Sequence, residues 1–275
     1  MPRLSSIVTI ALVAFAAPAL AAGPFGSAGG GTPPALAKNL NQPVPASLIA
    51  TLEKASKDGL GLGATPDRLV IKAVDGPRIA SGDKVGLLYV GADFCPYCAG
   101  QRWAIVLTLL RFGKLNGAEY MLSSPKDAYP NTPTFSFQHA KYTSKYLDFV
   151  PVETADRNGR VLMRRTKAQS DIFNKFDAPP YSQIFGGIPF IYLDGQYIIT
   201  LPMLLPGDLS GMDWQAAATA LANPESAQFQ KVMPQVNVLT AAICRLDGGN
   251  PDDVCSAPGV TAGNGALLRL SAGGS

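Results

Sequence analysis

The sequence contains a single histidine, and other features that mark particular classes of protein are also scarce. His139 lies in a polar stretch, where we expect a surface position. A zinc site would have to be built from the four cysteines, and only one of their two pairs has C-x-x-C spacing. The formal net charge is +3, without a long run of either sign, which argues against a nucleic-acid partner. We find no internal repeat.

Long hydrophobic runs occur only near the N-terminus. Residues 1–21 have a basic residue at Arg3, an apolar stretch over 7–17 and a small-residue motif ending at Ala21, a pattern typical of a cleaved secretory signal peptide. The stretch is shorter than the roughly 20 residues of a membrane-spanning helix, and an uncleaved membrane anchor is the alternative. No cysteine lies near Ala21, which argues against lipid attachment there. We therefore expect a periplasmic or extracellular protein, with a membrane-anchored one as the alternative.

The remainder of the chain divides by composition into three parts. Glycine, alanine and proline dominate residues 22–44, which predicts a flexible linker. Residues 45–257 are expected to form the folded domain, because an apolar fraction of 47% supports a core that does not depend on disulfides. Residues 258–275 are small and glycine-rich and predict a loose tail.

Hydrophobic periodicity predicts an alternation of strands and helices within this domain. The run 84–91 is almost continuously apolar, which suits a central strand. Pro151 argues against a central place for the strand 146–153, and Asp194-Gly195 predicts a hairpin turn. The further predicted strands are 68–74, 120–123, 134–137 and two short ones on either side of Asp194-Gly195 within 186–199. The predicted helices are 45–55, 101–112, 164–176, 214–218 and 225–245.

The motif Cys95-Pro96-Tyr97-Cys98 stands between a predicted strand and a predicted helix. A helix start favours a thiolate, so Cys95 is the candidate attacking residue and Cys98, one turn later, the resolving one. Pro96 needs no N–H in the first helical turn, and Tyr97 offers an aromatic surface to a partner peptide. A static structural disulfide between the two cysteines is the alternative.

The other two cysteines are Cys244 and Cys255. Four cysteines in an exported chain fit an oxidising compartment, and we expect this pair to form a structural disulfide that joins a helix end to the following loop. Closing such a short ring contributes roughly 2–3 kcal/mol by the loop-entropy estimate. A second redox pair that relays electrons is the alternative.

A second motif, Ile188-Pro189, stands about 90 residues after the first and directly before the predicted hairpin. The two motifs in this order resemble the thioredoxin superfamily, in which the proline is cis and faces the active-site sulfurs. The resemblance implies an α/β fold with a mixed sheet flanked by helices, an insertion between the third strand and the hairpin, and a helical C-terminal extension. It also implies that Ile188 and Pro189, with Pro96 and Tyr97, contact an extended substrate strand.

More narrowly, the chain resembles an uncharacterised thioredoxin-like family, domain of unknown function 929. The residues that carry this likeness are 91–99, 102–104, 121–125 and 129–135, and the match extends over about 45–255. The family brings no established substrate. It supports the expected fold and leaves the reaction to be inferred from the cysteines.

One position departs from thioredoxin itself. Thioredoxins keep a buried Asp six residues before the first cysteine, where this chain has Tyr89, and Asp93 stands where the superfamily has a more exposed side chain. An efficient reductase of the cytosolic kind is therefore disfavoured. Arg102 either favours the thiolate or is solvated, and Trp103 is expected in the core.

Together these observations predict an exported thiol–disulfide oxidoreductase that exchanges disulfides with protein thiols of the cell envelope. The chemistry needs no organic cofactor or metal, whereas an oxidase would need a membrane redox partner and a reductase or isomerase a reductant. The alternatives are a non-catalytic thioredoxin-like binding module and a client-specific redox chaperone.

Overall fold

Strand β2, Val85–Gly91, is buried along its whole length and lies inside the main sheet. The computed structural model describes residues 31–272, in which this sheet has the order β1-β9-β8-β2-β7. Strand β7 runs parallel to β2, whereas β8 is antiparallel to β2, so the sheet is mixed. The other strands are β1 Ile71–Ala73, β7 Leu147–Glu153, β8 Phe190–Leu193 and β9 Tyr197–Ile199.

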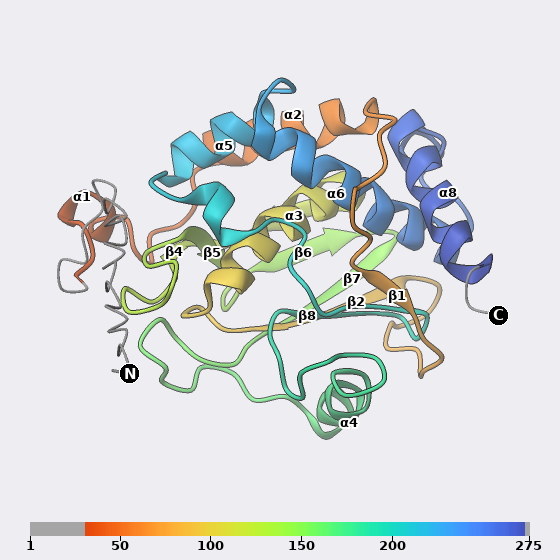
Figure 1. The fold of residues 1–275 in the computed structure, drawn as a ribbon, viewed down its shortest axis with the longest axis horizontal. Helices are drawn as coiled ribbons and strands as arrows, with labels where there is room; N and C mark the ends of the chain where they lie inside the picture. Colours follow the sequence, from red (N-terminus) through yellow and green to blue (C-terminus); the bar gives the residue numbers. More distant parts are fainter. Residues whose placement is uncertain (1–30, 273–275) are drawn as a thin grey trace, which may run out of the picture. The chain divides into compact units, whose positions relative to one another are not determined.

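The side chains of β2 alternate between two hydrophobic cores, as the pleat of a strand requires. Leu87 and Tyr89 join one core, and Leu88 and Val90 join the other. In Figure 1 most helices lie on the first side of the sheet and α4 on the second. The first group comprises α2 Ala46–Leu60, α3 Pro96–Phe112, α5 Trp214–Ala222, α6 Ala227–Leu246 and α8 Pro258–Ala272, and α4 spans Lys167–Phe176.

Between α3 and β7 in the sequence, the chain forms two small two-stranded sheets. Strand β3, Gly113–Asn116, pairs with β6, Lys141–Ser144, and β4, Glu119–Leu122, pairs with β5, Pro133–Ser136. The strand predicted over 120–123 is therefore not a third strand of the main sheet, and the insertion begins directly after α3. Periodicity indicates an extended segment, but it does not identify the partner strand.

Two predictions about the main sheet are confirmed. The predicted hairpin turn at Asp194-Gly195 joins β8 to β9 through residues 194–196, and Asp194 and Gly195 have positive φ of 41° and 88°. Pro151 lies in β7, which pairs only with β2 in this sheet and therefore forms its edge. An edge strand tolerates a proline because one of its sides needs no ladder hydrogen bonds.

The prediction of a loose tail over 258–275 is wrong for its described part. Residues 258–272 form α8, which packs against α6 and buries Val260, Ala266 and Leu267. A Cβ built at Gly263 would lie 2.6 Å from the Asn237 carbonyl oxygen, so the glycine allows the two helices to approach closely. The small residues that indicated disorder thus serve helix packing.

The described part of the predicted linker, 31–44, is also ordered against the domain. It contains α1, Pro34–Ala37, and Leu36, Leu40 and Val44 pack against the larger core. Backbone hydrogen bonds join Asn41 and Val44 to the β4 region. The predicted leader, 1–21, lies outside the described residues. None of the helices that are described has the length and hydrophobicity of a bilayer-crossing segment.

The packing of α8 predicts a difference between two neighbouring leucines. Leu267 is buried, whereas Leu268 is 51% exposed. Leu267→Ala should lower the free energy of unfolding by about 2–3 kcal/mol because it leaves a cavity, and Leu268→Ala should change it by less than about 0.5 kcal/mol. Urea unfolding followed by circular dichroism measures both values. Equal effects of the two substitutions would contradict the packing of α8.

Candidate dithiol site

Cys95 is the N-cap residue of α3, directly after the short turn that follows β2. Its backbone is extended, and Pro96 occupies the first helical position, where the missing N–H leaves no hydrogen bond unmade. The backbone N–H of Cys98 donates to Cys95 Sγ over 3.1 Å. The sulfur therefore takes the place that a Ser or Asp oxygen has in an ordinary helix cap.

The two thiols of the motif have different environments. Cys95 keeps 5% of its surface exposed, whereas Cys98 is fully buried. A hydrogen bond from the Cys98 thiol, the Cys98 and Tyr97 N–H groups and the charge of Arg102 lower the pKa of Cys95 against the effect of burial. Burial and the hydrogen bond to Cys95 raise the pKa of Cys98 well above its usual value. Of the two thiols, Cys95 is thus the one with the lower pKa and the one that keeps exposed surface.

The structure brings the two sequence motifs together. The Ile188 carbonyl oxygen lies 3.7 Å from Cys95 Sγ, and the Ile188–Pro189 peptide bond is cis. Pro189 is buried directly before β8, while Ile188 is partly exposed. Of the other predicted contact residues, Pro96 is buried and Tyr97 is exposed. Of these four residues, Ile188 and Tyr97 are therefore the two whose side chains keep exposed surface near the motif.

A buried set of charged groups lies on the same elements as the motif. Arg102, one turn after Cys98 in α3, is fully buried and donates to both carboxylate oxygens of Glu153 over 2.9 and 2.7 Å. Its Nη2 atom also lies 3.5 Å from Asp93. Arg102 is therefore not solvated, and Asp93 is buried rather than exposed as the superfamily pattern suggested.

One guanidinium faces two carboxylates in this set, and the two do not bind it equally. Ionising both would leave a net negative charge out of water, which is costly. Glu153 holds the two short contacts, whereas Asp93 has one long contact and a hydrogen bond of 3.2 Å from the Ser136 hydroxyl. Burial accordingly raises the pKa of Asp93 to about 7, against the opposing charge of Arg102. Asp93 is the carboxylate that takes a proton near neutral pH.

Glu153 was missed by the sequence analysis. It ends β7, and the parallel register places it opposite Gly91, the last residue of β2. An acidic residue at the end of a largely apolar strand was the available signal. Tyr89 is fully buried as its strand predicts, and Arg102 lies 5.8 Å from the centre of its ring. The Tyr89 ring therefore lies beside the buried Arg102, and it does not take the place of an acid.

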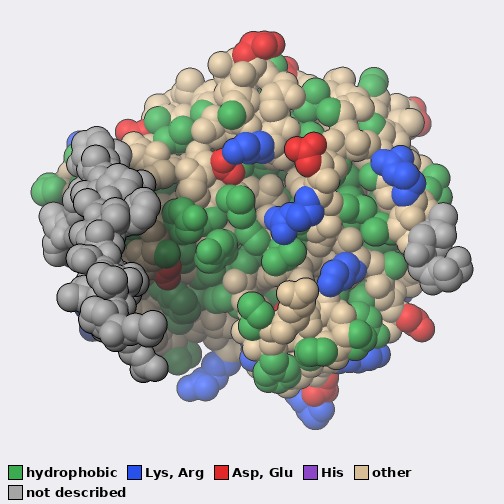
Figure 2. All heavy atoms as spheres, viewed as in Figure 1, with side chains coloured by type: hydrophobic (Ala, Val, Ile, Leu, Met, Phe, Trp, Pro, Cys, Tyr) green, Lys and Arg blue, Asp and Glu red, His purple; other side chains and the backbone are tan. Residues whose placement is uncertain are grey.

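Exposed hydrophobic side chains flank the cysteine motif. Ile184 and Phe185, in the loop that leads to Ile188, are 70% and 67% exposed. Tyr97 packs edge-on against Tyr129 on another loop, with ring centres 6.1 Å apart. Figure 2 shows hydrophobic side chains gathered in a hollow in the left half of this view, near the start of α3. This distribution is typical of a surface that contacts another polypeptide.

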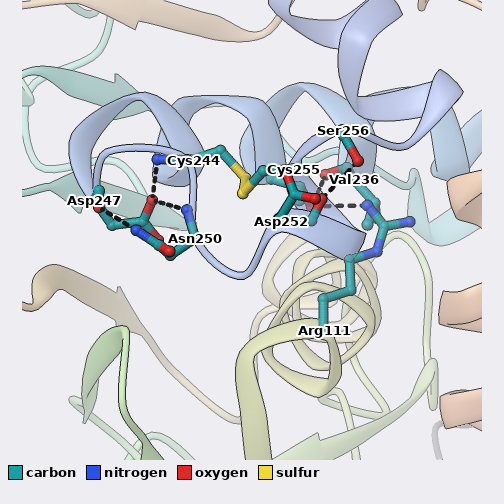
Figure 3. The surroundings of a disulfide bond; sticks show 10 residues. Arg111, Val236, Cys244, Asp247, Asn250, Asp252, Cys255 and Ser256 are labelled. Carbon is teal, nitrogen blue, oxygen red and sulfur yellow. Dashed lines mark hydrogen bonds between the residues drawn. A yellow bond between two sulfur atoms is a disulfide. The ribbon is translucent and has the colours of Figure 1, made fainter.

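Cys244 and Cys255 form a disulfide with a Cα–Cα distance of 5.6 Å, as the sequence predicted. It joins the end of α6 to α7, Asp252–Cys255, and Figure 3 shows the loop between them, in which the Asp247 carboxylate accepts hydrogen bonds from the Gly249 and Asn250 N–H groups. Because these two sulfurs are bonded to each other, they are not available as zinc ligands. The described residues contain no cluster of three or more residues able to hold a metal ion.

Two further expectations about single residues are confirmed. Trp103 is fully buried and donates to the Pro133 carbonyl oxygen over 2.8 Å, so it belongs to the core. His139 is exposed, and its Nδ1 atom lies 3.1 Å from Glu119.

Comparison with known proteins gives one match. The family described as Domain of unknown function (DUF929) matches residues 71–245, which is more than half of the chain. The matched segment includes both motifs and Glu153. No curated protein and no solved structure matches.

The raised pKa of Asp93 predicts how stability depends on pH. Since the folded value of about 7 lies above the unfolded value, the stabilisation from the protonated form is complete below about pH 4 and is lost as pH rises through about 7. Asp93→Asn cannot ionise, so from about pH 5 to about pH 8 the wild type should lose on the order of 2 kcal/mol relative to this variant. Urea unfolding at both pH values measures the difference, with Asp171→Asn, an exposed site on α4, as the control for general charge effects. A constant difference between wild type and Asp93→Asn would contradict the assignment.

The disulfide predicts a stability effect separate from the dithiol. Replacing Cys244 and Cys255 together by Ser should lower the free energy of unfolding by about 2–3 kcal/mol, because the unfolded chain regains the entropy of the closed loop. Denaturant unfolding measures this loss, and dithiothreitol should produce a similar loss in the wild type alone. If dithiothreitol destabilises the doubly substituted protein equally, the disulfide is not the cause.

Proposed function

The chain belongs to the family described as Domain of unknown function (DUF929), and from the geometry of the site we propose that it is a thiol–disulfide oxidoreductase. The observation that carries the proposal is the asymmetry between Cys95, whose pKa is lowered and which keeps some exposed surface, and Cys98, whose pKa is raised and which is fully buried. A static disulfide needs no such difference. Exchange chemistry requires it, because one sulfur must attack the client first and the other must react only later, with the mixed disulfide.

The proposed reaction proceeds through a mixed disulfide. The Cys95 thiolate attacks one sulfur of a client disulfide, a new S–S bond forms, and the other client sulfur leaves as a thiolate. Cys98 then loses its proton and attacks Cys95 Sγ, which releases the second client thiolate and leaves a Cys95–Cys98 disulfide. The client gains the two electrons that the dithiol loses. The reverse sequence oxidises a client dithiol.

Arg102 supports the attacking thiolate in this proposal. Its positive charge lowers the pKa of Cys95, and Glu153 keeps the guanidinium fixed by two hydrogen bonds. Removing one member of such a buried pair leaves an uncompensated charge and costs about 3–5 kcal/mol. Arg102 and Glu153 are thus positioning residues, which act on the client only through Cys95.

The arrangement of the main sheet supports a thioredoxin-like fold. Strand β2 leads into the cysteine motif and α3, β7 returns parallel to β2, and the hairpin β8–β9 follows a proline that stands beside the motif. The resemblance to the thioredoxin superfamily rests on this order and on the two motifs. It extends the proposal to a client that lies as an extended strand along Ile188.

We further propose that the client is a protein of the cell envelope. Three exposed hydrophobic residues, Tyr97 in the motif and Ile184 and Phe185 shortly before Ile188, would contact apolar residues on either side of a client cysteine. Export through the segment 1–21 would place these residues in a compartment where client disulfides occur. A separate redox partner would then restore the oxidised or reduced form.

The direct test is reduction of insulin by the protein in the presence of dithiothreitol. The wild type should accelerate precipitation of the insulin B chain, and Cys95→Ser should reduce the added rate to background because the attacking sulfur is gone. The variant with Cys244 and Cys255 both replaced by Ser is the matched control and should retain the wild-type rate. Equal rates for wild type and Cys95→Ser would refute the proposal.

A trapping experiment identifies the clients. Cys98→Ala should accumulate mixed disulfides at Cys95, because nothing resolves them, whereas Cys95→Ser combined with Cys98→Ala should accumulate none. Many trapped proteins would indicate a general catalyst, and one trapped protein would indicate a dedicated client. Failure of Cys98→Ala to trap any protein that the double variant does not also retain would contradict exchange through Cys95.

A further inference from the structure

A hollow of about 530 Å³ lies on the face of the main sheet opposite α3. Its lining is mostly apolar: Ile79, Val150 of β7 and Ala168 of α4 keep exposed surface, whereas Leu88 of β2 and Phe176 of α4 are fully buried behind it. The segment 77–79 forms another side. The dithiol is at the opposite face and at the end of β2, so this hollow is separate from the proposed reaction site.

The coverage of the sheet explains why the hollow exists. Five strands spaced about 4.8 Å apart make a sheet roughly 20–25 Å wide, whereas one helix is about 10–12 Å wide. Among the described residues, α4 is the one helix whose buried side chains join the core on this face. Its aromatic contacts go to β8, where Phe173 meets Phe190 and Phe176 meets Tyr192. The face over β2 is covered, since Leu88 and Val90 are fully buried, and the partly exposed Val150 of β7 is left beside the helix.

Two cations stand at the rim of the hollow. Lys175 makes no ion pair with a described carboxylate; its Nζ atom lies 3.5 Å from the Asp75 carbonyl oxygen and 4.6 Å from the centre of the Phe176 ring. Arg78 pairs with Asp194 through Nε and donates to the Lys84 carbonyl oxygen through Nη2. The one carboxylate on the rim, Asp171, is already paired with Lys167. The charge left uncompensated at the rim is therefore positive.

We propose that this hollow binds a small organic anion with an apolar body, a free carboxylic acid with a short hydrocarbon chain. The hydrocarbon would lie against Ile79, Val150 and Ala168, and the carboxylate would pair with Lys175 beside Arg78. A hollow of this size falls within the range of known small-molecule sites, which combine mostly apolar walls with a few polar groups. Neither the dithiol nor the Cys244–Cys255 disulfide takes part.

Isothermal titration calorimetry with decanoate tests the site. The full chain should bind one decanoate, and Lys175→Gln should weaken binding by at least about fivefold because the charge-assisted contact is lost. Lys57→Gln is the matched control and should bind as the wild type does, because Lys57 is exposed on α2, is not on the rim and forms no ion pair with a described carboxylate. Ala168→Trp, on the rim of the hollow, should abolish binding by filling it, with circular dichroism as the check that the fold is retained.

Three results would overturn the proposal. Decylamine binding as tightly as decanoate would show that the positive rim has no role. Equal weakening by Lys175→Gln and Lys57→Gln would show a general charge effect. Binding to phosphatidylglycerol vesicles without binding of free decanoate would assign the face to a membrane surface. The activity of Cys95 in the insulin assay is independent of all three, so failure here leaves the proposed reaction intact.

Discussion

The buried ion pair between Arg102 and Glu153 is the interaction on which the dithiol site depends. It joins α3, which carries the two cysteines, to the end of β7, which is the edge of the main sheet. The guanidinium is fully buried and needs a carboxylate with well-placed oxygens, because an unpaired charge in that position would be prohibitively costly. The pair thereby fixes the start of α3 against the sheet and supplies the charge that favours the Cys95 thiolate.

The same pair creates the protonation behaviour of its surroundings. Burial raises the pKa of Asp93 to about 7, and the charge of Arg102 offsets this only in part. The contacts differ accordingly, since Glu153 makes two short hydrogen bonds to Arg102 and Asp93 a single long one. A buried site with one cation and two acids can therefore hold one proton near neutral pH, on Asp93.

The sequence predicted the local elements better than their partners. The central strand, the hairpin at Asp194-Gly195 and the edge position of the strand with Pro151 depend on short-range rules, and these were correct. The strand at 120–123 was found but assigned to the wrong sheet, because periodicity contains no information about pairing. The glycine-rich segment 258–272 was predicted to be loose, yet its glycines permit close packing of α8 on α6, which only the neighbouring helix reveals.

For the site, the sequence alone singled out the residues of the proposed reaction, Cys95 and Cys98 at a strand-to-helix junction and Ile188-Pro189 before a hairpin, and it set Cys244 and Cys255 apart as a separate pair. These follow from motif spacing, because a helix start and a three-residue step fix where two sulfurs stand. Only the tertiary structure decided that Arg102 is buried, that Glu153 from a parallel strand is its partner and that Asp93 competes for it. The reason is physical: burial and charge pairing depend on residues far apart in the chain, and no local pattern encodes which of them will meet.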